Sequence, residues 1–161
     1  MDDDGNPTAK PGFYVPASAG SGYVDTVANP VGEATVTSIP FAGLGVTLNL
    51  TEQGEGFTII GDAYADNITG SGGNDTIEGG GGNDSLFGGN GDDVFRFGNG
   101  GFLAGVSVDG GQGTDTLVFT AASQSVADAA FANKSNLEAL TLSNGVNSVA
   151  LQENRFWTCL G

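Results

Sequence analysis

Short segments of alternating apolar and polar residues recur along the chain, separated by stretches rich in glycine, asparagine and aspartate. Three of them precede residue 61, at residues 34–39, 46–50 and 57–60, and another spans residues 116–120. Such alternation is typical of a short strand with one buried face. The pattern predicts an all-β chain built from short strands.

The C-terminal part gives a mixed pattern. Residues 125–133 are rich in alanine and predict one short helix, with Ser123 or Ser125 as its cap. Two strand-like segments follow at 140–142 and 148–151, with Asn144-Gly145 between them. An Asn-Gly pair favours a hairpin, and a further coil of a repeating fold fits the same segments. We expect the apolar residues of these flanks to form ordinary core.

From residue 61 the chain repeats with a period of nine residues. Four contiguous blocks occupy 61–69, 70–78, 79–87 and 88–96, and a fifth at 110–118 returns after thirteen residues. Position 1 is glycine and position 8 is large and apolar in all five blocks. Position 6 is always aspartate, namely Asp66, Asp75, Asp84, Asp93 and Asp115. A fixed period of this kind indicates a fold in which similar coils stack on one another.

Each block has the composition of a turn followed by a strand. Six residues form the turn, where glycine permits positive φ and close approach of the backbone to an ion, and three residues form the strand. Because alternate strand residues face opposite ways, position 8 should point into the core. Stacked strands lie ~4.8 Å apart, so turns one coil apart bring their aspartates to one edge.

The blocks closely resemble the G-G-x-G-x-D-x-U-x nonapeptides of RTX (repeats-in-toxin, haemolysin-type) calcium-binding proteins. The copies at 70–78, 79–87 and 88–96 match best, whereas the first block has Asp62 and Tyr64 in place of two glycines. The resemblance covers about a third of the chain, roughly residues 61–118. It implies a right-handed parallel β-roll or β-helix with two nonapeptides a turn and calcium between the turns on each edge.

An all-oxygen cage of aspartate side chains and loop carbonyls suits Ca²⁺, which takes six to eight oxygen ligands at ~2.3–2.6 Å. Because two blocks make one coil, each block lies beside the second block after it, which pairs Asp66 with Asp84 and Asp75 with Asp93. Asp93 also pairs with Asp115 if residues 97–109 take the place of one block. The predicted ligands are these five aspartates and the loop residues Gly70, Gly72, Gly79, Gly81, Gly88 and Asn90.

Neighbouring polar residues have other expected roles. Asn74, Asn83 and Asp92 stand at position 5 and should orient the loops rather than bind metal, and Asp62 is a substitute ligand in the imperfect first block. Residues 61–118 carry nine acidic side chains and one basic one. Their mutual repulsion predicts a segment that stays expanded without metal and folds when calcium binds.

Composition removes several classes of function. The 161 residues include 19 acidic and 4 basic ones, for a net charge of −15, which argues against nucleic-acid or anionic-membrane partners. Histidine is absent and Cys159 is the single cysteine, which excludes His-based catalytic triads, intrachain disulfides and cysteine-rich metal sites. No apolar run is long enough to span a membrane, and we expect no Sec signal, because residues 1–7 contain neither a basic nor an apolar region. We therefore expect a protein that is not an enzyme.

We expect four segments: a flexible tail or linker at 1–22, a capping β segment at 23–60, the β-roll at 61–118 and a β-rich cap at 119–161. The resemblance implies a calcium-binding module of a secreted bacterial protein that leaves through type I secretion machinery and folds in extracellular calcium. The alternative is a fragment of a large RTX adhesin or exoenzyme whose flanking β segments attach to a surface, a matrix or another copy. An autonomous hydrolase is a third reading, which lacks a visible nucleophile and base.

Overall fold

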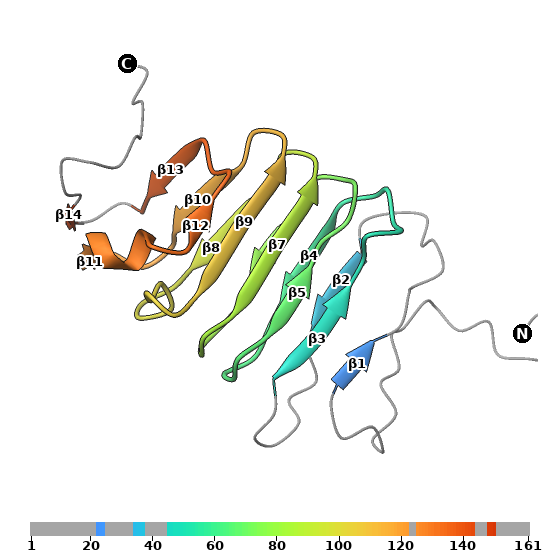
Figure 1. The fold of residues 1–161 in the computed structure, drawn as a ribbon, viewed down its shortest axis with the longest axis horizontal. Coiled ribbons are helices and arrows are strands. Elements are labelled where there is room, and N and C mark those ends of the chain that lie inside the picture. Colours follow the sequence, from blue (N-terminus) through green and yellow to red (C-terminus); the bar gives the residue numbers. More distant parts are fainter. Residues whose placement is uncertain (1–21, 25–33, 38–44, 123–124, 144–147, 151–161) are drawn as a thin grey trace, which may run out of the picture.

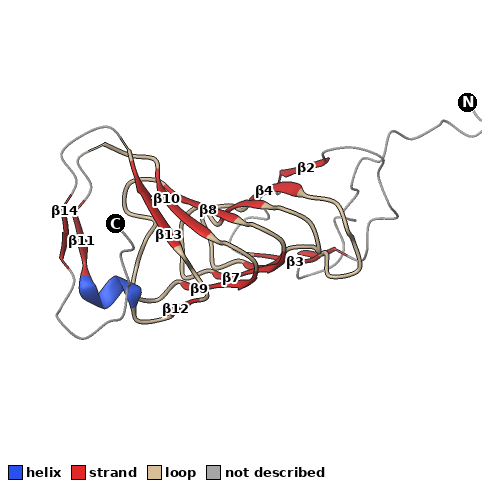
Figure 2. Cartoon of the chain, turned by 90° about the horizontal axis from the view of Figure 1, so that it is seen from above, coloured by secondary structure: helices blue, strands red, loops and turns tan. Residues whose placement is uncertain are grey.

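Two parallel six-stranded sheets lie face to face in this structure, a computed structural model that describes residues 22–24, 34–37, 45–122, 125–143 and 148–150. Figure 1 shows the strands stacked side by side, and Figure 2 shows the two layers that they form. The described strands between residues 22 and 119 alternate between the layers, so each pair of strands makes one coil, and the strands at 125–127 and 148–150 form a separate two-stranded sheet. The result is an all-β solenoid of about four turns, as the repeat predicts.

The first sheet contains β1 (Gly22–Val24), β3 (Val46–Asn49), β5 (Asn67–Thr69), β7 (Ser85–Asn90), β9 (Ser107–Gln112) and β12 (Lys134–Ser135). The second sheet contains β2 (Ala34–Thr37), β4 (Phe57–Ile60), β6 (Thr76–Glu78), β8 (Val94–Phe97), β10 (Thr116–Phe119) and β13 (Ala139–Leu142). We call edge 1 the side where turns 61–66, 79–84 and 98–106 lead from the second sheet to the first. Edge 2 is the opposite side, with turns 70–75, 88–93, 110–115 and 136–138.

The nine-residue period fixes both the register and the core. Ile68 pairs with Leu86 and Ile77 with Phe95, so residues two blocks apart lie side by side on neighbouring coils. All five position-8 side chains are buried between the sheets, with at most 2% exposure: Ile68, Ile77, Leu86, Phe95 and Leu117. The prediction that position 8 faces inward is confirmed, and this stack of apolar side chains is the core that holds the turns in place.

The strands predicted before the repeats are confirmed as β2, β3 and β4, slightly shorter than expected for the first two. They join the same two sheets as the repeat strands, since β3 pairs with β5 and β4 pairs with β6. The expected segment boundaries lie at residues 60/61 and 118/119, and both sheets continue across them with the same strand pairing. The division into capping segments and β-roll stays a prediction.

Residues 97–109 take the place of one block, because β9 pairs with β7 and β10 with β8. The longer turn brings Phe102 edge-on against Phe97, Phe119 and Phe131, with ring centroids 5.1, 5.0 and 5.0 Å away. The Lys134 ammonium lies 4.6 Å from the Phe102 ring centroid and donates to the carbonyls of Leu103 and Val106. These contacts close the core at the C-terminal end of edge 1.

The helix predicted over 125–133 is wrong. The segment forms β11 (Ser125–Ala127) and then one 3₁₀ turn, η1 (Asp128–Phe131), which has no side-chain cap. Val126 and Phe131 are buried, with 4% and 3% exposure. Because a helix this short is marginal by itself, burial of these side chains outweighs the helix propensity of the alanines. Ser123 lies outside the described residues.

The hairpin alternative for the C-terminal strands is also wrong. β13 pairs in parallel with β10, and β14 (Ser148–Ala150) pairs in parallel with β11. β13 thus extends the second sheet by one more coil, which agrees with the other reading of the sequence. The Asn144-Gly145 pair, residues 1–21 and residues 151–161 with Cys159 lie outside the described residues. Within the described ranges no helix is long and apolar enough to cross a membrane.

Candidate metal centre

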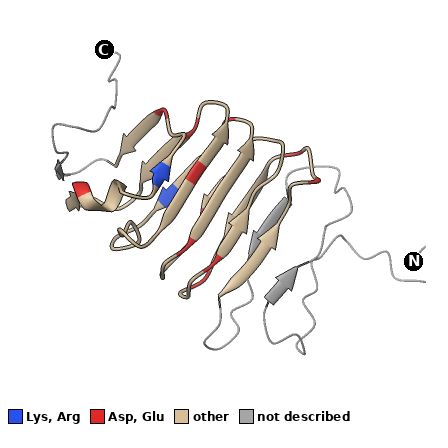
Figure 3. Cartoon of the chain, in the orientation of Figure 1, with Lys and Arg blue, Asp and Glu red and all other residues tan. Residues whose placement is uncertain are grey.

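The five position-6 aspartates are buried at the two edges of the solenoid. Figure 3 shows acidic residues in the turns along both edges. Their side chains are at most 2% exposed: Asp66, Asp75, Asp84, Asp93 and Asp115. Buried carboxylates are costly unless each oxygen meets a hydrogen-bond donor or a cation, so the partners of these oxygens decide what the edges can do.

One oxygen of every carboxylate binds the backbone of the preceding coil. Oδ1 of Asp84 accepts a hydrogen bond from the N–H of Asp66 at 3.0 Å, on edge 1. On edge 2, Oδ1 of Asp93 accepts from the N–H of Asp75, and Oδ1 of Asp115 accepts from the N–H of Asp93, both at 2.8 Å. The three pairs proposed from the sequence are therefore neighbours on adjacent coils.

The second oxygen divides the aspartates into two groups. Oδ2 of Asp84, Asp93 and Asp115 is buried without a hydrogen-bond partner. Oδ2 of Asp66 and Asp75 instead accepts a hydrogen bond from the N–H at position 2 of its own block, at 2.8 and 2.6 Å. Three carboxylates thus keep an open oxygen, and two do not.

Position 2 of the block accounts for this division. It is glycine with positive φ in the three blocks with an open Oδ2, where Gly80, Gly89 and Gly111 have φ of 92°, 118° and 102°. In the other two blocks it is Asp62 or Ser71, neither of which has a positive φ. Only glycine adopts this conformation readily, so the consensus Gly-Gly directs the position-2 N–H away from the aspartate.

Carboxylate and backbone carbonyl oxygens meet at position 1 of the block. A Cβ built on Gly88 would lie 2.1 Å from Oδ2 of Asp93 and 2.4 Å from the carbonyl oxygen of Gly110, one coil further on. At Gly61 the corresponding distances are 2.3 Å to Asp66 Oδ2 and 2.3 Å to the Gly79 carbonyl. A side chain at position 1 would clash with a carboxylate and a carbonyl oxygen in four blocks, and at Gly79 it would clash with the Asp84 carboxylate.

Burial makes these carboxylates reluctant to ionise in the metal-free fold. It raises the pKa of Asp84 to about 6 and that of Asp93 to about 7, against the lowering effect of the N–H donors of Asp66 and Asp75. Burial likewise raises the pKa of Asp66, Asp75 and Asp115. A cation at the edges would supply the positive charge that the ionised carboxylates lack.

The donor set fits a hard divalent cation. The described residues contain no cluster of three or more His, Cys, Asp or Glu side chains that could hold a metal. Each pair of turns instead offers carboxylate and backbone carbonyl oxygens. Such an all-oxygen set suits Ca²⁺, whose flexible shell accepts carbonyls readily, whereas Mg²⁺ demands a stricter octahedron and keeps its waters.

Among the other predicted ligands, the carbonyls of Gly79 and Gly88 lie beside Gly61 and Gly70 at these oxygen-rich corners. The N–H groups of the other four predicted ligands donate to backbone carbonyls of neighbouring coils: Gly70 to Phe87, Gly72 to Gln53, Gly81 to Asp62 and Asn90 to Ser71. These hydrogen bonds involve only the N–H groups. The carbonyls of the same four residues therefore remain predicted ligands.

The expected loop-orienting role of position 5 is confirmed at Asn74 and Asp92. Oδ1 of Asn74 accepts from the N–H of Asp92 at 2.9 Å, and Oδ1 of Asp92 accepts from the N–H of Thr114 at 2.8 Å. Asn83 packs against Gly105 of the longer turn. Asp62 Oδ1 accepts from the N–H of Tyr64 at 2.7 Å and its buried Oδ2 has no partner, so its role as a ligand stays a prediction.

Sequence reasoning missed Glu138. Its Oε2 accepts the N–H of Asp115 at 2.7 Å, as an aspartate of the next coil would. The signal is Glu138-Ala139-Leu140, an acidic residue two places before a large apolar one, as in every nonapeptide. The signal is hard to see because the consensus glycines are missing from the turn before it.

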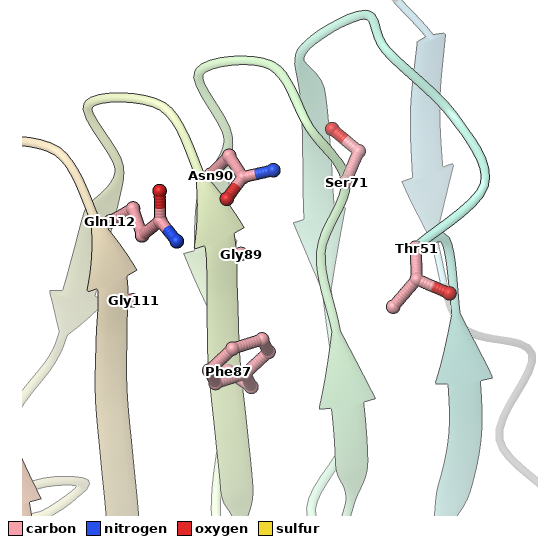
Figure 4. A pocket seen from close by; sticks show the side chains of 7 residues that line it. All are labelled: Thr51, Ser71, Phe87, Gly89, Asn90, Gly111 and Gln112. Atoms are coloured by element: carbon pink, nitrogen blue, oxygen red, sulfur yellow. The ribbon is translucent and has the colours of Figure 1, made fainter.

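A shallow pocket of about 180 Å³ lies on the outer face of the first sheet beside edge 2 (Figure 4). Seven residues line it: Thr51, Ser71, Phe87, Gly89, Asn90, Gly111 and Gln112. None of them has an ionisable side chain, so this pocket offers no residue for acid–base chemistry.

Comparison with known proteins identifies the repeats. Residues 60–95 match the family model of the RTX calcium-binding nonapeptide repeat, in four copies. Comparison with curated proteins and with solved structures gave no significant match. The block at 110–118 lies beyond the matched residues, although it continues the same ladder of aspartates. The resemblance seen in the sequence is thus confirmed: residues 60–95 match RTX calcium-binding nonapeptide repeats.

Proposed function

We propose that this chain is a non-catalytic β-roll module that completes its folding when calcium binds between successive coils. The observation that carries the proposal is the buried, unpartnered Oδ2 of Asp84, Asp93 and Asp115. In this proposal, Ca²⁺ binds at Asp66/Asp84 on edge 1 and at Asp75/Asp93 and Asp93/Asp115 on edge 2. Carbonyls of the adjacent turns, beginning with those of Gly79, Gly88 and Gly110, complete the shells.

The charge of the chain explains why the ion decides whether the turns close. Residues 61–118 hold nine acidic side chains and one basic one, Arg96, and four buried carboxylate oxygens in this range lack a donor, those of Asp62, Asp84, Asp93 and Asp115. Bound calcium neutralises this charge where it is least solvated. A site with a Kd of ~10⁻⁴ M adds ~1.4 kcal/mol to the free energy of unfolding in ~1 mM calcium. Several such sites would decide the folding of so short a repeat.

The proposed setting is outside the cell, in line with the export that is typical of RTX proteins. Calcium is scarce in the cytosol, so the acidic chain would stay expanded there and suit a type I secretion channel. It would then fold in millimolar calcium. The proposal requires site affinities in the range of extracellular modules, Kd ~10⁻⁴–10⁻³ M, well above that of cytosolic buffers.

Titration of Ca²⁺ into EDTA-treated protein tests this function, with far-UV circular dichroism as the readout. We expect little β signal in EDTA and a cooperative rise with a midpoint of ~10⁻⁴–10⁻³ M Ca²⁺. Equal concentrations of Mg²⁺ serve as the control and should produce a much smaller change. A full β spectrum in EDTA that calcium leaves unchanged would refute calcium-coupled folding. A midpoint of ~10⁻⁷ M would refute the extracellular setting.

A further inference from the structure

Edge 2 does not end with the last nonapeptide. Thr116 pairs with Val94 on one side and with Ala139 on the other, so Glu138 stands beside Asp115 as Asp115 stands beside Asp93. The turn that leads into β13 is only residues 136–138, against six residues in a nonapeptide turn. The coil therefore continues in space although the repeat has ended in the sequence.

The hydrogen bonds of this turn reproduce those of the repeats. The N–H of Asp115 donates to Glu138 Oε2 at 2.7 Å, and the N–H of Asp93 donates to Asp115 Oδ1 at 2.8 Å. The N–H of Ala139 donates to the Asp115 carbonyl at 3.0 Å, as the N–H of Thr116 donates to the Asp93 carbonyl at 2.8 Å. The longer glutamate side chain thus reaches the place that an aspartate occupies in a full-length turn.

The backbone carbonyl of Asn136 also lies where a carbonyl lies in the repeats. A Cβ built on Gly110 would lie 1.9 Å from the carbonyl oxygen of Asn136 and 2.4 Å from Asp115 Oδ2, much as at Gly88 one coil earlier. Asn136 has φ 51°, the one positive φ at a non-glycine among the described residues. Its side chain donates to Asp109 Oδ1 at 2.7 Å, which helps to hold this conformation.

The Asp115 carboxylate, which also borders the proposed Asp93/Asp115 site, supplies a second sign of a missing ligand. The residue is 0% exposed, and its Oδ2 has no hydrogen-bond partner. This oxygen and the Asn136 carbonyl converge on the same corner, beside the ionisable Glu138. Two oxygen acceptors that converge without a donor form a place that a cation, a proton or a donating water molecule would fill.

We propose that Asp115, Glu138 and the carbonyl of Asn136 form a further divalent-cation site, beyond the nonapeptides. The inference rests on the proposed function, since it extends the same calcium ladder by one coil. The ladder on edge 1 has no such extension, because Val106 follows Asp84 in register and the Lys134 ammonium binds the Leu103 and Val106 carbonyls. The solenoid would thus carry more ions on edge 2 than on edge 1.

The test compares the number of bound Ca²⁺ ions in the wild type, Glu138→Gln and Glu52→Gln, by equilibrium dialysis of the full chain. Glutamine keeps an oxygen for the Asp115 N–H but removes the charge, and Glu52 is an exposed control. We expect Glu138→Gln to bind one ion fewer than the wild type and Glu52→Gln to bind the same number.

Equal ion counts in the wild type and Glu138→Gln would overturn this site and leave the proposed function intact. A loss in Glu52→Gln as large as that in Glu138→Gln would also overturn it, because the effect would then be general electrostatics. A wild type that binds no calcium would overturn both proposals. If Glu138→Gln fails to fold, wild-type crystals grown in calcium decide the matter: an anomalous peak beside Asp115 Oδ2 and Glu138 supports the site, and none overturns it.

Discussion

Asp93→Asn should remove both calcium ions that border Asp93 and lower the free energy of unfolding by about 3 kcal/mol in ~1 mM calcium, if each site has a Kd of ~10⁻⁴ M. Asp93 borders two proposed calcium sites, because its Oδ1 accepts a hydrogen bond from the N–H of Asp75 and its own N–H donates to Oδ1 of Asp115. Asp84 lies next to one aspartate only, because Val106 follows it on edge 1. Asp84→Asn should therefore cost about half as much as Asp93→Asn.

The same substitution should act in the opposite direction without metal. Asparagine can still accept the N–H of Asp75, but it carries no buried charge, so Asp93→Asn should stabilise the chain in EDTA. The matched control is Asp92→Asn, an exposed neighbour whose replacement keeps an oxygen for the Thr114 N–H. Far-UV circular dichroism of these variants in EDTA and thermal denaturation in calcium measure the two effects. A loss of calcium-dependent stability in Asp92→Asn as large as that in Asp93→Asn would contradict the shared role of Asp93.

Metal-free protein should be more stable near pH 4 than near pH 8. Burial raises the pKa of Asp84 to about 6 and of Asp93 to about 7 in the folded chain, above the value of ~3.9 in an unfolded chain. The folded state therefore binds more protons than the unfolded state between these values. The stabilising contribution is complete below pH ~4 and is lost as the pH rises through 6 and 7.

Saturating calcium should reverse this trend. Protons and calcium compete for the same carboxylate oxygens, so calcium binds more tightly as the pH rises, and the calcium-bound protein should be destabilised by acid. Far-UV circular dichroism in EDTA and melting temperatures in calcium, both measured from pH 4 to pH 8 at constant ionic strength, give the two trends. A metal-free β content that rises over this range would contradict the raised pKa values.

The nine-residue period predicted most of the fold and the aspartate pairs for one physical reason. A constant period places position 8 in the core and position 6 at an edge on every coil, so a single register fixes both. This is why Ile77 and Phe95 pair in the core while Asp75 and Asp93 pair on edge 2. Residues 97–109 take the place of one block, so the aspartates of the neighbouring coils stay in register and the N–H of Asp93 still donates to Asp115.

The parts that were not predicted depend on competition between local preference and packing. Burial of Val126 and Phe131 prevented the alanine-rich helix, and stacking of β13 on β10 prevented the hairpin. Glu138 was missed because a longer side chain compensates for a shorter turn. The division of the aspartates by their open oxygens depends on the direction of the N–H at position 2, which composition alone does not reveal.

The central claim is that the open oxygens of Asp84, Asp93 and Asp115 bind calcium between successive coils. Crystals grown in calcium chloride, with anomalous data collected at long wavelength, test it most directly. We expect an anomalous peak at each of the pairs Asp66/Asp84, Asp75/Asp93 and Asp93/Asp115, with carboxylate oxygens ~2.3–2.6 Å away. A map without these peaks, in which the same oxygens face water or a hydrogen-bond donor, would contradict the account.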